Sequence, residues 1–159
     1  MSRRDQIVMS DEEVADFLAE QRTLVCATHG PRGWPHLMPL WYVVRPTGDG
    51  DAPQVWAWTF AKSQKVRNLE RDPRATLQVE AGERYEELRG AMLRAGVEIH
   101  RDHDTVLALG MELLLRYSTD PDEATRRGTL SQVPKRVALQ FRVRDVVSWD
   151  HRKFSVARR

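Results

Sequence analysis

The stretch Val55–Glu80, VWAWTFAKSQKVRNLERDPRATLQVE, predicts a strand, a tight turn, a short helix and a second strand. Aromatic and β-branched residues fill Val55–Phe60, as is usual in strands. Ser63 is a suitable N-cap for the helix. Asp72-Pro73 should end the helix, because the residue before a proline avoids the α-helical region. Apolar and polar residues then alternate, which indicates a half-buried strand.

Hydroxyl and basic side chains gather where the first of these strands meets the helix. They are Thr59, Lys62, Ser63, Lys65 and Arg67. The free N–H groups at a helix N-terminus attract anions, and hydroxyl and ammonium groups add donors and charge. This combination favours a phosphate group as the ligand. The alternative is a capped helix with a solvated basic face, since helices with several lysines are common.

The same stretch resembles the phosphate-binding segment of the pyridoxamine 5'-phosphate oxidase-like family, the split β-barrels that bind flavins and deazaflavins. In that family a strand ending in threonine precedes a serine, a basic residue and a helix that ends near Asn/Asp-Pro. Thr59, Ser63, Lys65 and the exit Asp72–Ala75 match this pattern. The run Lys65–Leu69, together with that exit, is similar to the branch that uses the deazaflavin coenzyme F420.

The resemblance covers residues 10–154 and implies one split β-barrel domain, a mainly β fold with about six antiparallel strands and accessory helices. It also implies that F420, or alternatively FMN, binds in the groove between the two subunits of a homodimer. In that family the second strand flanks the ring system, and the C-terminal strand edge approaches the cofactor from the partner subunit. The cofactor-binding residues suggested in this way are Pro39, Trp41, Thr59, Lys62, Ser63, Lys65, Trp149, His151 and Arg152.

Composition limits the class of protein. With 159 residues, 41% hydrophobic and 30% charged, the chain is typical of one soluble globular domain. A net charge of +2 is too small to indicate nucleic-acid binding. The single cysteine, Cys26, excludes an internal disulfide, suits a reducing cytoplasm and should be buried in an apolar strand. No apolar run is long enough for a membrane span and no signal peptide is evident, so we expect a cytoplasmic location.

The remaining elements follow from local patterns. Ser10–Glu13 forms a capping box that should begin a helix ending near Gln21. We expect strands over residues 23–28 and 35–45, and one long strand or two short ones, broken at Gly90 and Gly96, over 85–100. We also expect polar loops over 46–51 and 119–131, a helix over 101–117 and a last strand from about residue 135.

The second strand is apolar on both faces, which predicts a barrel wall that is also covered by a helix or a second subunit. The chain also contains five tryptophans, at positions 34, 41, 56, 58 and 149. A barrel of this size cannot hide so much apolar surface alone, and this favours a homodimer.

The sequence contains no nucleophile elbow, Rossmann or P-loop pattern, and no convincing metal-ligand spacing, so we assign no catalytic residue and no metal. The resemblance implies hydride transfer from reduced F420 to a small conjugated acceptor, with the cofactor carrying the chemistry. One alternative is an FMN-binding oxidase or reductase. Others are a non-enzymatic protein that binds a flavin, deazaflavin or tetrapyrrole, and a dimeric scaffold with an empty turn.

A surplus of cations favours the deazaflavin over riboflavin phosphate. The deazaflavin spreads its negative charge over a phosphodiester, a lactyl carboxylate and a polyglutamate tail, whereas riboflavin phosphate ends in one dianion. Scattered cations suit the longer anion, through contacts that salt should weaken. They are Lys62, Lys65, Arg67, Arg74, Arg152 and Lys153.

Overall fold

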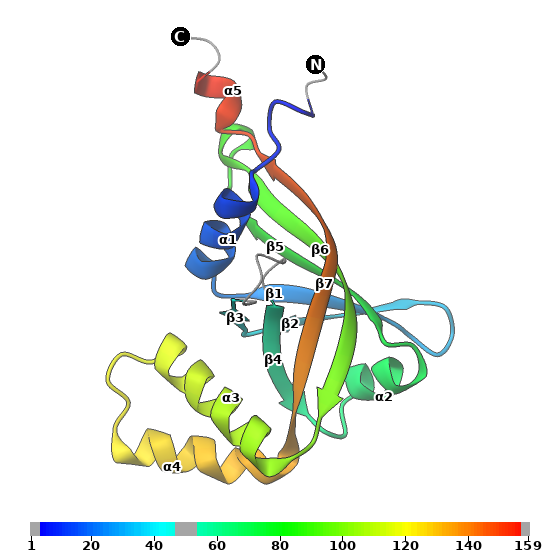
Figure 1. Ribbon diagram of the computed structural model, residues 1–159, viewed down its shortest axis with the longest axis vertical. Coiled ribbons are helices and arrows are strands. Elements are labelled where there is room, and N and C mark those ends of the chain that lie inside the picture. The colour runs from blue at the N-terminus through cyan, green and yellow to red at the C-terminus, as the bar shows by residue number, and fades with distance from the viewer. Residues whose placement is uncertain (1–3, 47–53, 157–159) are drawn as a thin grey trace.

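A computed structural model describes residues 4–46 and 54–156 and confirms the split β-barrel (Figure 1). In the described residues, the strands are β1 (Leu24–His29), β2 (Pro35–Leu40), β3 (Val43–Arg45), β4 (Gln54–Phe60), β5 (Arg74–Ala81), β6 (Arg89–His100) and β7 (Arg136–Asp150). The helices are α1 (Asp11–Glu20), α2 (Gln64–Arg71), α3 (His103–Tyr117), α4 (Glu123–Gln132) and α5 (Lys153–Val156), with 3-10 turns at Tyr85–Glu87 and Val133–Lys135. The polar loop expected over residues 46–51 lies, except for Pro46, outside the described residues.

The sheet is antiparallel throughout, in the order β2-β1-β5-β6-β7-β4-β3. Strands β2 and β3 are neighbours in sequence yet lie at opposite edges, so the expected single strand over residues 35–45 is wrong. This break raises the number of strands from the expected six to seven within the described residues. Contacts between Tyr42 and Tyr117 explain this break. The Tyr42 N–H donates to the Tyr117 hydroxyl at 2.9 Å, and the same hydroxyl lies 2.9 Å from the Tyr42 carbonyl oxygen. The chain therefore turns at Tyr42 from one sheet edge to the other.

The local signals at two helices are confirmed. Ser10 and Glu13 form the capping box of α1, with the Ser10 N–H donating to the Glu13 carboxylate at 2.7 Å. Ser63 caps α2, and Asp72 ends it before Pro73. Because these caps depend on side chains within one turn of the helix end, the sequence alone was sufficient to predict them.

The apolar residues form two cores. The main core fills the barrel and includes the buried Cys26 together with inward residues of β5, β6 and β7. The second core lies between α3 and the outer face of β4 and β7, and it includes Trp56 and Leu109. Gly110 lets α3 approach closely, since a Cβ at this position would come within 2.6 Å of the Trp58 ring. Helix α3 is thus packed closely against the barrel.

The prediction of a polar loop over residues 119–131 is wrong, because α4 occupies most of that range. Asp122 is its N-cap and accepts from the Thr125 N–H at 2.8 Å. Since α4 buries none of its own residues, it lacks the apolar stripe from which an amphipathic helix is recognised. In the described part of the chain, no helix has both the length and the apolar character that a membrane span requires.

Strand β2 is exposed on both faces in the single chain, so no helix covers the apolar wall predicted from its sequence. It is an edge strand that pairs only with β1. Trp34 is 80% exposed, and Leu37, Met38 and Trp41 are also exposed. In the described residues of the single chain, the helix cover that the sequence analysis considered is absent.

Candidate functional site

The turn between β4 and α2 presents an open helix N-terminus. Ser63 Oγ accepts from the Val66 N–H at 3.4 Å, and its carbonyl oxygen accepts from the Arg67 N–H at 3.3 Å. The N–H groups of Gln64 and Lys65 come before the first intrahelical bond and point out of the helix end. Lys62 is exposed beside them. This turn can therefore offer two amides, a hydroxyl and an ammonium group to an anion.

Lys65 lies behind this turn and is only 4% exposed. Its Nζ donates to Thr59 Oγ1 at 3.0 Å, and no carboxylate of the described residues forms an ion pair with it. Burial lowers the pKa of Lys65, and the nearby charge of Arg136 lowers it further. The neighbouring Cys26 acts in the opposite direction without cancelling the shift, and burial raises the pKa of its own thiol to about 12.

Arg136 is a second cation at this end of the barrel, and the sequence analysis missed it. It begins β7 opposite Phe60, with its guanidinium 3.7 Å from the Phe60 ring centroid and 5.0 Å from that of Trp58. Its Nε is buried without a hydrogen-bond partner, and burial lowers the pKa of the group. Only the register between β4 and β7 reveals this position, so no local motif could have found it.

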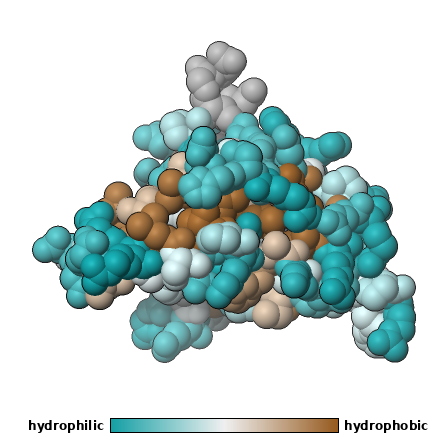
Figure 2. Space-filling model, turned by 90° about the horizontal axis from the view of Figure 1, so that it is seen from below, coloured by the Kyte–Doolittle hydropathy of each residue, from teal (hydrophilic) through white to brown (hydrophobic). Residues whose placement is uncertain are grey.

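These two cations share an unusual state. Lys65 is buried, whereas Arg136 is partly buried with its Nε withdrawn from water, and none of the described residues pairs a carboxylate with either of them. A buried charge without a counter-charge is costly, so the arrangement favours an anionic ligand that would supply the missing charge. Figure 2 views the molecule from below and shows hydrophobic residues gathered at its centre, surrounded by hydrophilic ones. Phe60, which is 49% exposed, contributes an apolar ring beside Arg136.

Pro39 and Trp41 lie on the β2 side of the molecule. Pro39 is exposed, and Trp41 is 58% exposed while its indole stacks on the Tyr117 ring at 4.5 Å between centroids and 8° between planes. Cα atoms of β2 and β4 approach within 8 Å, which closes the barrel on this side. An aromatic face is thus open to a flat ligand, held from behind by Tyr117.

The structure places Trp149, His151 and Arg152 at the opposite end of the molecule from α2, next to α5 (Figure 1). Residues 136 and 150 are the two ends of β7, 14 residues apart, or roughly 45 Å along a strand. His151 Nδ1 lies 2.8 Å from the Tyr85 carbonyl oxygen, and Arg152 forms an ion pair with Asp150 at 2.6 Å. A single chain therefore does not bring these residues to the β4–α2 turn.

Three of the six cations that favoured the deazaflavin already have partners. Arg74 pairs with Asp72 at 2.7 Å, and Lys153 pairs with Glu13 at 2.6 Å, in addition to the Arg152 pair. The sequence analysis counted these charges without their carboxylates. Among the described residues, no group of three or more His, Cys, Asp or Glu could hold a metal ion.

The sequence profile of the family described as pyridoxamine 5'-phosphate oxidase matches residues 10–150. The chain belongs to this family. No functionally curated protein matches the chain.

Several solved structures are similar to this member of the family. The conserved hypothetical protein Rv2991 from Mycobacterium tuberculosis is 37% identical, with a TM-score of 0.84 over 98% of this chain and 93% of that one. A protein named F420 reductase is 23% identical, with a TM-score of 0.60 over 83% and 94%. The heme storage protein HutZ from Vibrio cholerae is 17% identical, with a TM-score of 0.65 over 87% and 94%. The last two similarities show the fold alone.

Proposed function

We propose that this protein binds the deazaflavin coenzyme F420 and acts as an oxidoreductase on a small conjugated acceptor. The observation that carries the proposal is the buried Lys65 near the partly buried Arg136, both without a carboxylate partner among the described residues. The family and the shared fold with an F420 reductase support the same reading. FMN is the alternative cofactor, since its phosphate would also supply an anion.

The residues of the β4–α2 turn fit a phosphate group. Ser63 Oγ, the amides of Gln64 and Lys65, and the guanidinium of Arg136 would hold it, and Lys62 would add an exposed charge. Lys65 would act from behind Thr59, mainly through its charge. Bound F420 supplies the hydride chemistry, so the protein needs no nucleophile of its own.

Pro39 and Trp41 would border the ring system, because they present an exposed proline and an exposed indole on the edge strand side. Trp149, His151 and Arg152 would reach the cofactor from a partner subunit, since their own chain holds them at the far end of β7. The exposed apolar faces of β2 fit such a homodimer. Light scattering at micromolar concentration should give the dimer mass, and a clean monomer mass would contradict this assembly.

Fluorescence titration with F420 and with FMN tests the proposal. Lys65→Ala should weaken cofactor binding about 10- to 150-fold, the equivalent of about 1.5–3 kcal/mol for one charge-assisted contact. Ser63→Ala should cost less. Arg67→Ala is a matched control on the same helix, because Arg67 is exposed and outside the buried pair; it should change affinity less than about fivefold. If Lys65→Ala folds and binds as tightly as the parent, the phosphate lies elsewhere.

Turnover separates an enzyme from a storage protein of the same fold. The protein should accelerate oxidation of reduced F420 when candidate enones or quinones are present. Tight binding without any acceleration by such acceptors would instead support a carrier of the cofactor.

A further inference from the structure

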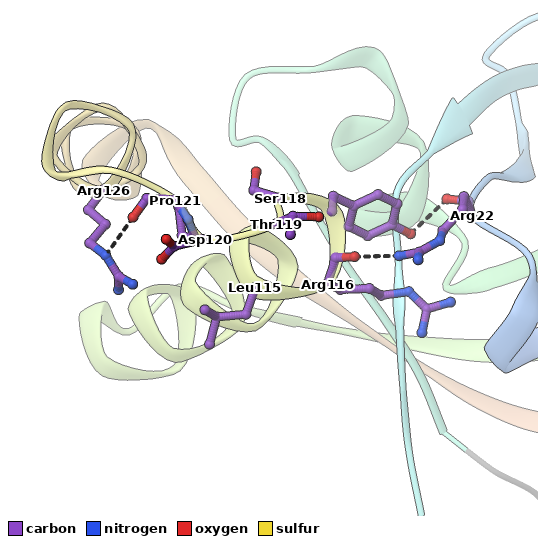
Figure 3. Close-up of a pocket in the computed structure, with 9 residues that line it drawn as sticks. Arg22, Leu115, Arg116, Ser118, Thr119, Asp120, Pro121 and Arg126 are labelled. Carbon is purple, nitrogen blue, oxygen red and sulfur yellow. Dashed lines mark hydrogen bonds between the residues drawn. The ribbon is translucent and has the colours of Figure 1, made fainter.

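A cleft that includes no residue of the β4–α2 turn lies where the end of α3 meets the start of β1 (Figure 3). It has a volume of about 620 Å³, within the range of small-molecule sites. The residues that decide its character are Arg22, Leu115, Arg116, Tyr117, Asp120 and Arg126. Three guanidinium groups and one carboxylate therefore line a single cleft, which gives its wall an excess of positive charge.

Backbone carbonyl groups hold all three arginines in place. Arg22 donates to the Arg116 carbonyl oxygen, and Arg126 Nε donates to the Pro121 carbonyl oxygen at 3.1 Å. One terminal nitrogen of Arg116 reaches three carbonyl oxygens at the end of α1, those of Leu18, Ala19 and Gln21, at 3.2, 3.0 and 2.7 Å. Guanidinium groups fixed in this way lose little further conformational freedom when a ligand binds.

None of these three arginines forms an ion pair with a carboxylate of the described residues. Arg127, one residue beyond Arg126, shows the contrast, because it pairs with Glu123 at 3.5 Å on the outer side of α4. Carbonyl groups orient a guanidinium without neutralising it. The cleft therefore keeps its positive charge while its arginines are already positioned, which is the state that suits an anion.

The basic side chains occupy two ends of the cleft. Figure 3 shows Arg22 and Arg116 at one end and Arg126 at the other, with Leu115, Ser118, Thr119 and Asp120 between them. Leu115 is 59% exposed, but Ser118, Thr119 and Asp120 make the middle largely polar. We propose that this cleft binds a small organic dianion, with an acidic group at each end. Carboxylates and phosphates share the bidentate geometry that guanidinium groups recognise.

The same cleft is joined to the exposed aromatic face of β2. Tyr117 lines the cleft, stacks on Trp41 and brings its hydroxyl to 2.7 Å from the Arg22 carbonyl oxygen. A ligand bound between Arg22 and Arg126 should therefore alter the surroundings of Trp41, and tryptophan fluorescence can report it. None of the residues that line the cleft belongs to the β4–α2 turn, and the cleft meets the proposed cofactor site where Tyr117 stacks on Trp41.

Titration of the cofactor-free protein at constant ionic strength tests the dianion site. The probes are α,ω-dicarboxylates and terminal diphosphates of increasing chain length, with acetate and inorganic phosphate as single-ended comparisons. We expect saturable fluorescence changes for one class of double-ended anion. Arg22→Gln and Arg126→Gln should each weaken that binding at least about tenfold, as expected for a lost charge-assisted contact. Arg127→Gln is the matched control and should leave binding unchanged.

Each outcome decides the proposal, and the probe series also identifies the acidic group. Arg116 is not substituted because it caps α1, and the circular dichroism of the variants checks that they fold. Absence of saturation up to about 10 mM would overturn the site. If Arg127→Gln weakened anion binding equally, the binding would depend on general surface charge and not on this cleft. Acetate or inorganic phosphate binding as tightly as the best double-ended anion would overturn the two-ended geometry.

Discussion

The two ends of β7 differ in whether their charged groups have partners of opposite charge. At its last residue, Asp150 is 5% exposed and is fully engaged, because Arg152 donates through its backbone N–H and two side-chain nitrogens. At its first residue, Arg136 has a buried Nε without a partner, and Lys65 nearby is 4% exposed with only Thr59 as a contact.

This difference separates charges that stabilise the fold from charges that are available to a ligand. A buried carboxylate with three donors completes its own interactions. Buried cations without a counter-charge cost free energy of folding, and proteins retain such costs where function requires them. The sequence analysis ranked Arg152 and Lys65 together, whereas their partners assign them to different roles in the single chain.

The largest expected effect is at the satisfied end. Arg152→Ala leaves Asp150 buried without its guanidinium, so we expect a loss of about 1.5–3 kcal/mol in the free energy of unfolding. For a chain of this length that is a fall of about 3–12 °C in the melting temperature. Calorimetry of parent and variant at neutral pH measures it. An unchanged melting temperature would mean that the ion pair between Arg152 and Asp150 does not stabilise the fold.

The stability of parent and Arg152→Ala at acidic pH provides a control for this prediction. Hydrogen bonds from Arg152 lower the pKa of Asp150, so the folded state releases this proton more readily than the unfolded state. The stability from this pair is present above the unfolded aspartate pKa of about 3.9 and is lost as pH falls through the lower folded value. The difference between parent and Arg152→Ala should therefore shrink in that acidic window.

Lys65→Met tests the end of β7 where the cations lack a carboxylate partner. We expect it to raise the stability of the protein, whereas Arg152→Ala should lower it. Replacing a buried, unpaired ammonium by an apolar side chain of similar length should raise the stability of the cofactor-free protein by about 1–2 kcal/mol. Cofactor affinity should fall at the same time. Urea unfolding measures the first and fluorescence titration the second. A loss of stability would mean that the bond from Lys65 to Thr59 is structural.

The pH dependence of this variant has a defined direction. Burial lowers the pKa of Lys65 below its usual 10.5, so the unfolded chain holds this proton over a range where the folded chain does not. Parent stability should therefore gain from this group as pH rises from the lowered value towards 10.5, and Lys65→Met should remove that gain.

Local chemistry explains what the sequence could predict. Ser63 and Asp72-Pro73 act within one helical turn, so α2 was found correctly. The break at Tyr42 depends on Tyr117, which lies 75 residues away in the sequence. Helix α4 has no apolar stripe from which it could be predicted. The β4–α2 turn was likewise visible from neighbouring residues. Arg136 joins it only through the register of two strands that are far apart in sequence, so no single-sequence pattern could include it.

The dependence of cofactor affinity on salt concentration is the smallest effect that we expect, and it separates the exposed cations from the buried ones. The sequence analysis attributed a preference for the deazaflavin to six cations, but Arg74, Arg152 and Lys153 are paired in the structure. Lys62 and Arg67 are still exposed near the turn and able to meet an extended anionic tail. Each such contact should contribute about 0.2–1 kcal/mol and be screened by salt, whereas the buried pair should be screened much less.

Deazaflavin affinity should therefore fall more steeply with salt than riboflavin phosphate affinity, while the deazaflavin remains the tighter ligand at low salt. A Lys62→Gln and Arg67→Gln double variant should bring the two salt dependences together, because it removes the exposed contacts and leaves Lys65 and Arg136 in place. Fluorescence titrations of both ligands in parent and variant measure this. If riboflavin phosphate binds more tightly at every salt concentration, the buried cations serve a compact phosphate, and the FMN alternative is correct.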